Sequence, residues 1–93
     1  MLVALERFDL RIPGCGSLKE KRHVVKTLTA SLRQKFNVAV AEVEHQDLWQ
    51  RSRLAVVSVN TDHGHLESTL QSVAGEAENA RDIQVLDVST EIL

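Results

Sequence analysis

The sequence is poor in the residues that several common classes of protein depend on. It has one cysteine, Cys15, so no disulfide can form within the chain, which argues against a small disulfide-bonded secreted domain. No apolar run approaches the roughly 18 residues that a membrane-spanning helix needs. The first seven residues become charged too early for a signal peptide. These absences predict a cytoplasmic protein with no membrane partner.

Aromatic residues are also scarce, with no tyrosine, one tryptophan and two phenylalanines. An RNA-recognition-type sheet needs aromatic side chains on its central strands to stack on bases. The strand predicted over residues 54–60 has none, and Phe8 falls on the core side of the first strand. The glycine clamp of a KH domain is absent as well. Any binding of RNA is therefore expected to depend on its backbone or shape rather than on base stacking.

The remaining composition fits one small folded domain. With 43% apolar and 26% charged residues, the chain has material for a core and charge for solubility, so residues 1–93 are expected to form a single domain. Charge is unevenly distributed along it. Residues 1–53 hold ten Lys and Arg against six Asp and Glu, whereas residues 54–93 hold one against seven. Such an asymmetry bears on partners and long-range fields rather than on the fold.

Four segments have the patterns of β-strands. Along residues 2–12 apolar residues recur at every second position, which predicts a strand with one buried face. Glu6 interrupts that row and suggests a bulge or an end effect near it. Residues 38–43 and 54–59 are rich in β-branched residues and are joined by a polar connection, as in an antiparallel hairpin. Residues 83–92 complete the set.

Two helices are predicted between these strands. Ser17 and Glu20 form a capping box, and the apolar stripe that follows predicts a helix over residues 18–35. Asp62 can cap a second helix, whose apolar stripe has smaller side chains. The order is then β-α-β-β-α-β. Two right-handed split βαβ units place both helices on one face of a four-stranded antiparallel sheet, with the first and third strands central. This is an α+β, ferredoxin-like sandwich.

Three stretches resemble a known family. They are Ile12-Pro13-Gly14 with residues 17–22, Val40-Ala41-Glu42-Val43 with residues 46–51, and the weaker Leu86-Asp87-Val88. Across nearly the whole chain, they are similar to the YlxP-type family of small uncharacterised bacterial proteins. This resemblance implies a ferredoxin-like fold, a bacterial cytoplasmic origin and genes that often lie beside those of translation-initiation and ribosome-maturation factors. It implies no catalytic residues and no cofactor.

The turn into the first helix is the main candidate site. Gly16 and Ser17 precede a helix N-terminus, whose free N–H groups and positive dipole end attract anions. Basic residues crowd the first turns, and others could extend the positive surface. One interpretation is a phosphate-contacting patch for RNA, which the family context directs to ribosomal RNA or a ribosomal subunit; the other is a capped helix with a solvated basic face. The basic residues concerned are Lys19, Lys21, Arg22, Lys26, Arg33, Arg51 and Arg53.

Trp49 and the histidines each allow two interpretations. Trp49 lies in the polar hairpin connection, where it serves either as an exposed anchor for a protein partner or as a plug at the end of the core. His63 and His65 resemble a metal pair, but zinc needs three or four ligands, so no metal is predicted.

Two readings compete with RNA binding. Acylphosphatases are ferredoxin-like and hold phosphate between the first strand and first helix, which would here be Gly14 to Ser17 with Arg22 as a phosphate ligand. Their usual loop pattern is missing, and Cys15 has no evident base partner, so no catalytic residue is assigned. The third reading is self-association. The strand at residues 38–43 is expected at a sheet edge with Ala39, Ala41 and Val43 on its second face, which invites a homodimer.

Overall fold

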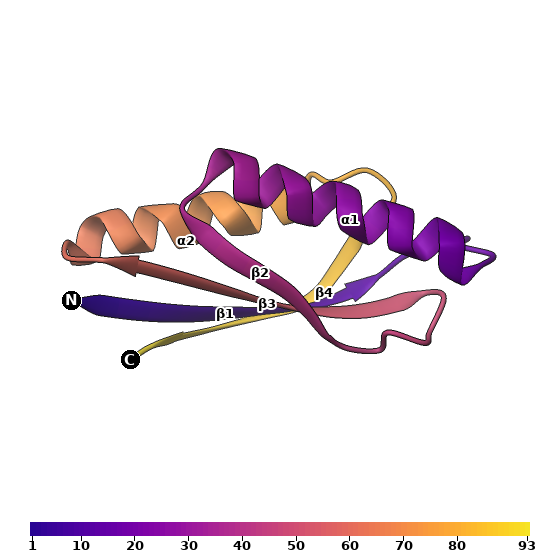
Figure 1. The fold of residues 1–93 in the computed structure, drawn as a ribbon, viewed down its shortest axis with the longest axis horizontal. Coiled ribbons are helices and arrows are strands. Elements are labelled where there is room, and N and C mark those ends of the chain that lie inside the picture. The colour runs from indigo at the N-terminus through magenta and orange to yellow at the C-terminus, as the bar shows by residue number, and fades with distance from the viewer.

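The six predicted elements appear in the expected order. The computed structural model describes residues 1–93 and contains β1 (Leu2–Arg11), α1 (Leu18–Lys35), β2 (Val38–Glu44), β3 (Arg51–Asn60), α2 (His63–Glu78) and β4 (Gln84–Ile92). The strands form one antiparallel sheet in the order β2-β3-β1-β4. Both helices cover the same face of this sheet (Figure 1). The ferredoxin-like sandwich is therefore confirmed, with β2 and β4 at the edges.

The core lies between the sheet and the two helices. The central strands contribute Phe8 and Leu10 from β1 and Leu54 from β3, all with no exposed surface. From above, Leu32 of α1 and Val73 of α2 pack into the same cluster. Burial of each large apolar side chain stabilises the fold by roughly 1.5–3 kcal/mol. The alternation along β1 thus places its apolar row against the helices.

Glu6 does not cause the bulge that the interrupted row suggested. It stays in register opposite Val56 of β3 and Thr90 of β4 and is buried with the apolar row. The irregularity between β1 and β4 falls instead between Asp9 and Leu10. The strand pairing tolerates the charged side chain because the backbone ladder does not depend on side-chain type.

Both helices begin at the predicted caps. The Ser17 hydroxyl accepts a hydrogen bond from the backbone N–H of Glu20, and the Asp62 carboxylate accepts one from the N–H of His65. Each bond satisfies one of the free N–H groups of a helix first turn. Neither helix has the length and apolarity needed to cross a bilayer.

The second face of the sheet has no helix over it, and we call it the open face. Toward the chain termini it presents the exposed Val57 and Val59 of β3 beside Ala39 of the edge strand β2. The exposed Ala41 lies in the middle of β2 and the exposed Val43 at its hairpin end. Toward the β2–β3 hairpin the open face presents charged side chains. The open face therefore has an apolar half and a charged half.

Candidate functional site

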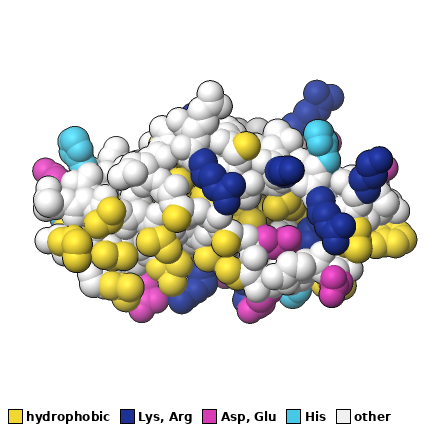
Figure 2. All heavy atoms as spheres, viewed as in Figure 1, with side chains coloured by type: hydrophobic (Ala, Val, Ile, Leu, Met, Phe, Trp, Pro, Cys, Tyr) yellow, Lys and Arg dark blue, Asp and Glu magenta, His cyan; other side chains and the backbone are white.

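Four basic side chains lie on one flank of α1. Lys19, Arg22, Lys26 and Arg33 are all exposed, and their spacings of three, four and seven residues bring them to one helical face. We call this set the α1 stripe. At about 1.5 Å per residue it extends for roughly 21 Å along the helix. Figure 2 shows Lys and Arg side chains gathered over α1.

The α1 stripe has no acidic partners. The chain has eleven Lys and Arg, and salt bridges hold five of them: Arg7, Lys21, Lys35, Arg51 and Arg53. No member of the stripe makes a salt bridge; Arg33 donates a hydrogen bond to the backbone carbonyl of Val40 in the edge strand β2. Four of the six cations without a carboxylate therefore lie side by side above the β2 edge of the sheet.

Lys21 is a correction to the predicted basic patch, because its side chain is fully buried. Its ammonium lies 2.6 Å from the Glu42 carboxylate and donates to the carbonyl oxygens of His45 at 2.7 Å and Gln46 at 3.4 Å. Ser52 donates to the same Glu42 oxygen at 2.6 Å. Lys21 therefore fastens the start of the β2–β3 hairpin to α1 and has no free donor to offer a ligand.

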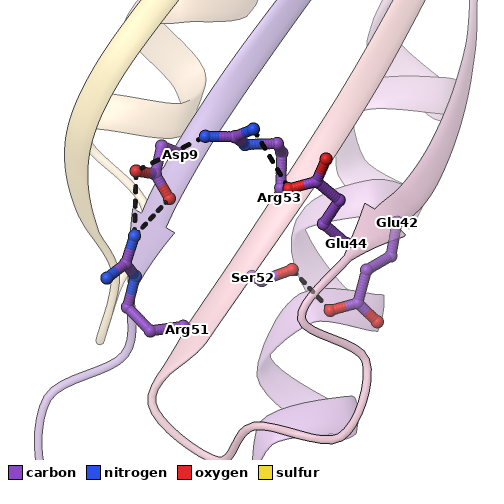
Figure 3. Close-up of polar contacts among 6 residues, drawn as sticks. All are labelled: Asp9, Glu42, Glu44, Arg51, Ser52 and Arg53. Carbon is purple, nitrogen blue, oxygen red and sulfur yellow. Dashed lines mark hydrogen bonds and ion pairs between the residues drawn. The ribbon is translucent and has the colours of Figure 1, made fainter.

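Arg51 and Arg53 are also misplaced by the sequence prediction. They project from β3 on the open face, whereas Ser52 between them faces Glu42 and α1 (Figure 3). Arg51 lies 2.9 Å from the Asp9 carboxylate, and Arg53 lies 3.1 Å from that of Glu44 and 3.9 Å from that of Asp9. These two guanidinium groups are neutralised on the far side of the sheet and do not extend the α1 stripe.

The anion site expected at Gly16 and Ser17 is occupied by the protein itself. The backbone N–H of Gly16 donates to the Glu20 carboxylate at 2.9 Å, and the Ser17 hydroxyl accepts from the N–H of Glu20 at 3.1 Å. A carboxylate thus already stands where a bound anion would meet the helix N-terminus. The N–H of Gly16, which a phosphate in this turn would need, is thus taken by Glu20, and Arg22 belongs to the α1 stripe.

Trp49 lies in the hairpin between β2 and β3, with 53% of its surface exposed. Its neighbour Gln50 donates a side-chain hydrogen bond to the carbonyl of Cys15 and accepts one at its own carbonyl from the N–H of Ile12. These bonds hold the hairpin beside the turn that leads into α1 (Figure 1). Trp49 therefore does not plug the core, and it lies at the end of the molecule where the α1 stripe begins.

The remaining candidates are the histidines and Cys15. No group of three or more His, Cys, Asp and Glu residues is placed to hold a metal ion. His63 lies 3.5 Å from Glu67 on α2. Cys15 is buried, and its thiol donates to the carbonyl of Ser17 at 3.3 Å. Sequence reasoning missed one unusual group, the buried Glu6, although its position in an apolar row was a visible signal.

Comparison with known proteins places the chain near one family. The sequence model of the family described as "Protein of unknown function (DUF503)" matches residues 3–90. A protein of Bacillus subtilis (strain 168) described as "Uncharacterized protein YlxP" is 36% identical over 90 residues, which cover 97% of this chain and 98% of that relative. Neither description assigns an activity.

Solved structures with the same fold have unrelated descriptions. Acylphosphatase from Bacillus subtilis is 20% identical with a TM-score of 0.51, over 100% of this chain and 86% of that one. SnoaB, a cofactor-independent oxygenase from Streptomyces nogalater, is 14% identical with a TM-score of 0.53, over 99% and 90%. The de novo designed protein Foldit4 is 11% identical with a TM-score of 0.55, over 100% and 97%. Similarity at these identities shows a shared fold alone.

Proposed function

The chain belongs to the DUF503 family of proteins of unknown function, and on that premise we propose that it is a non-enzymatic protein that binds the phosphate backbone of ribosomal RNA through the α1 stripe. The observation that carries the proposal is the grouping of four exposed cations without acidic partners on one helix face. Unpaired cations in a row attract a polyanion and release its counterions on binding. We choose ribosomal RNA as the ligand because the YlxP-type resemblance implies genes beside those of ribosome-maturation factors.

The surroundings of the stripe favour phosphate over bases as the contact. Of the three aromatic side chains, Phe8 is buried and Phe36 is partly buried against the core, so neither offers a stacking platform on the sheet. Glu20, the acidic residue in the first turn of α1, is engaged with Gly16. The stripe therefore offers charge without base readout, which suits RNA contact by shape and backbone. Trp49, exposed at the same end, is proposed as the anchor for a protein component of the ribosomal particle.

Binding to ribosomal RNA is tested by co-sedimentation with purified ribosomal subunits and by titration of labelled single-stranded RNA at several salt concentrations. Four phosphate contacts predict that the logarithm of the binding constant falls with the logarithm of salt at a slope of about −3. Association is expected at about 50 mM salt and should be strongly weakened at about 200 mM. Absence of association at the lower salt concentration would reject the proposal.

A matched pair of triple variants distinguishes the effect of the α1 stripe on binding from the effect of net charge. Replacement of Lys19, Arg22 and Lys26 by Gln should reduce the salt slope to about −1 and weaken binding at low salt by at least tenfold. The control replaces three exposed cations elsewhere, Arg7, Arg11 and Arg81, by Gln, and so changes the net charge equally. Equal losses in the two variants would show that binding does not depend on the α1 stripe.

A further inference from the structure

Glu6 is a buried carboxyl group with an unpaired oxygen. It lies on the central strand β1, on the side that faces α2, and only 3% of its surface is exposed. Its Oε2 accepts a long hydrogen bond of 3.4 Å from the Thr90 hydroxyl of β4, and its Oε1 has no partner. Buried polar atoms without partners are rare because each loses the hydrogen bonds that water would supply. This one calls for a ligand.

Glu6 also lines an open cleft of about 310 Å³ between α2 and the edge strand β4. The polar side chains around this cleft are Glu67 and Gln71 of α2 and Thr90 of β4, and the apolar ones are Leu70, Ala74 and Ile92. No Lys, Arg or His lines it. The cleft thus contains the buried carboxyl group of Glu6 and the exposed carboxylate of Glu67, and its remaining wall is largely apolar.

From this arrangement we propose that the cleft binds an aliphatic diamine. One ammonium group pairs with the carboxyl group of Glu6 where this residue lines the cleft, the methylene stem packs on Leu70, Ala74 and Ile92, and the second ammonium meets Glu67. A charged donor satisfies a buried carboxylate better than a neutral one does. The volume lies at the lower end of the range typical of small-molecule sites, which suits a short unbranched stem. The site is separate from the α1 stripe and does not depend on it.

Binding is expected to depend on pH. Burial raises the pKa of Glu6 to about 7, against a smaller opposing effect of the Thr90 hydrogen bond. A bound ammonium favours the ionised carboxylate and expels the proton, so affinity should be higher at pH 8 than at pH 6. The other titratable groups near the cleft are on α2, namely Glu67 and the His63 that lies 3.5 Å from it. Glu6 faces Val56 on β3 and Thr90 on β4, and neither titrates.

The test is a titration of the full chain with 1,4-diaminobutane, followed by amide chemical shifts in ¹H–¹⁵N spectra. Saturable shifts around Glu6, Leu70 and Thr90 are expected. Glu6→Gln should weaken binding by at least about tenfold, because the charge-assisted hydrogen bond is lost. Glu67→Gln should reduce the affinity for the diamine to that for 1-aminobutane. Glu78→Gln is the matched control, because Glu78 is exposed on the same helix outside this cleft.

A second variant keeps the proposal testable if Glu6→Gln alters the fold. Ala74→Leu fills the cleft without changing charge and should also prevent saturation. Shifts that grow linearly and equally in Glu6→Gln and Glu78→Gln would overturn the proposal as non-specific charge binding. Saturation by Mg²⁺ without any response to the diamine would also overturn it, in favour of a cation held by oxygen ligands.

Discussion

Glu6 combines a cost in stability with a defined response to pH. In the unfolded chain its carboxyl group ionises near its ordinary pKa of 4.5, whereas burial raises the pKa to about 7 in the folded protein. Between these values the unfolded state releases the proton and the folded state keeps it. The free energy of unfolding therefore falls as the pH rises from about 4.5 to about 7. The full difference corresponds to at most about 3.4 kcal/mol.

Glu6→Gln should remove this dependence on pH. Glutamine has nearly the same shape and stays neutral, so the variant is expected to exceed the original in stability by about 2–3 kcal/mol at pH 8 and to equal it near pH 4. Urea denaturation at pH 4, 6 and 8 measures the difference. Glu78→Gln, an exposed substitution, should leave the pH profile unchanged. Parallel profiles for the original protein and Glu6→Gln would contradict the raised pKa.

The β2–β3 hairpin depends on α1 through the single buried cation Lys21. Its ammonium group donates hydrogen bonds to two carbonyl oxygens of the hairpin and forms a salt bridge with the Glu42 carboxylate. A helix residue thus fixes the position of a loop that carries Trp49. The buried Lys21–Glu42 salt bridge therefore helps to set the position of the proposed protein anchor relative to the α1 stripe, together with the bonds of Gln50 to the turn before α1.

Lys21→Met should destabilise the protein by about 3 kcal/mol, because it leaves the Glu42 carboxylate without its cation and two carbonyls without a donor. Chemical denaturation measures the loss, and Lys21→Met combined with Glu42→Gln should recover part of it. Lys35→Met serves as the control, since the Lys35–Glu76 salt bridge lies at the surface and should be worth at most about 1 kcal/mol. Equal losses in the Lys21 and Lys35 variants would refute the structural role of Lys21.

At the level of elements, sequence patterns were sufficient for the fold. Apolar period, capping residues and β-branched runs depend on near neighbours in the chain, so α1 was predicted with the ends that the structure has, Leu18 and Lys35. The start of β3 at Arg51 was missed. Residues 51–53 are polar, and they become part of the strand by pairing with residues 9–11 of β1, which are distant in the sequence.

The candidate site was predictable only in part for the same reason. Helical spacing alone brings Lys19, Arg22, Lys26 and Arg33 to one face, and this grouping holds. Spacing cannot tell that Lys21, on the opposite side of the helix, meets Glu42 from another element. Nor can it tell that Arg51 alternates to the open face while Ser52 faces α1. Burial of a charge depends on contacts that only the folded chain makes.

For the whole molecule, the distribution of charge differs from that along the sequence. Among the basic residues of the first 53 positions, the four of the α1 stripe are unpaired on the helix layer, whereas Arg7, Arg51 and Arg53 pair with carboxylates on the sheet. The molecule is elongated, with principal extents of 42, 20 and 18 Å. The two faces present different surfaces to partners. The helix side is charged, and the open face is apolar near the chain termini.

The apolar half of the open face leads us to expect a homodimer. Val57 and Val59 are 39% and 46% exposed on the central strand β3, beside Ala39 and Ala41 of β2. Figure 2 shows hydrophobic side chains gathered at the lower left of the molecule, toward the end where Figure 1 marks the chain termini. A twofold interface needs a self-complementary surface. The apolar half can meet its own copy, and the charged half carries both signs in Asp9 and its arginine partners.

Sedimentation equilibrium tests this expectation against a protomer of 10.4 kDa. A standard interface covers about 800 Å² per partner, roughly a seventh of the 5619 Å² surface of this chain, which the open face can provide. We expect a species of about twice the protomer mass at micromolar concentration. Val57→Lys should yield monomers, because it would bury an unpaired charge at the centre of the interface. Ser68→Lys, exposed on α2, should leave the dimer intact. A monomer at all concentrations would contradict the expected homodimer and would mean that the open face is exposed to water.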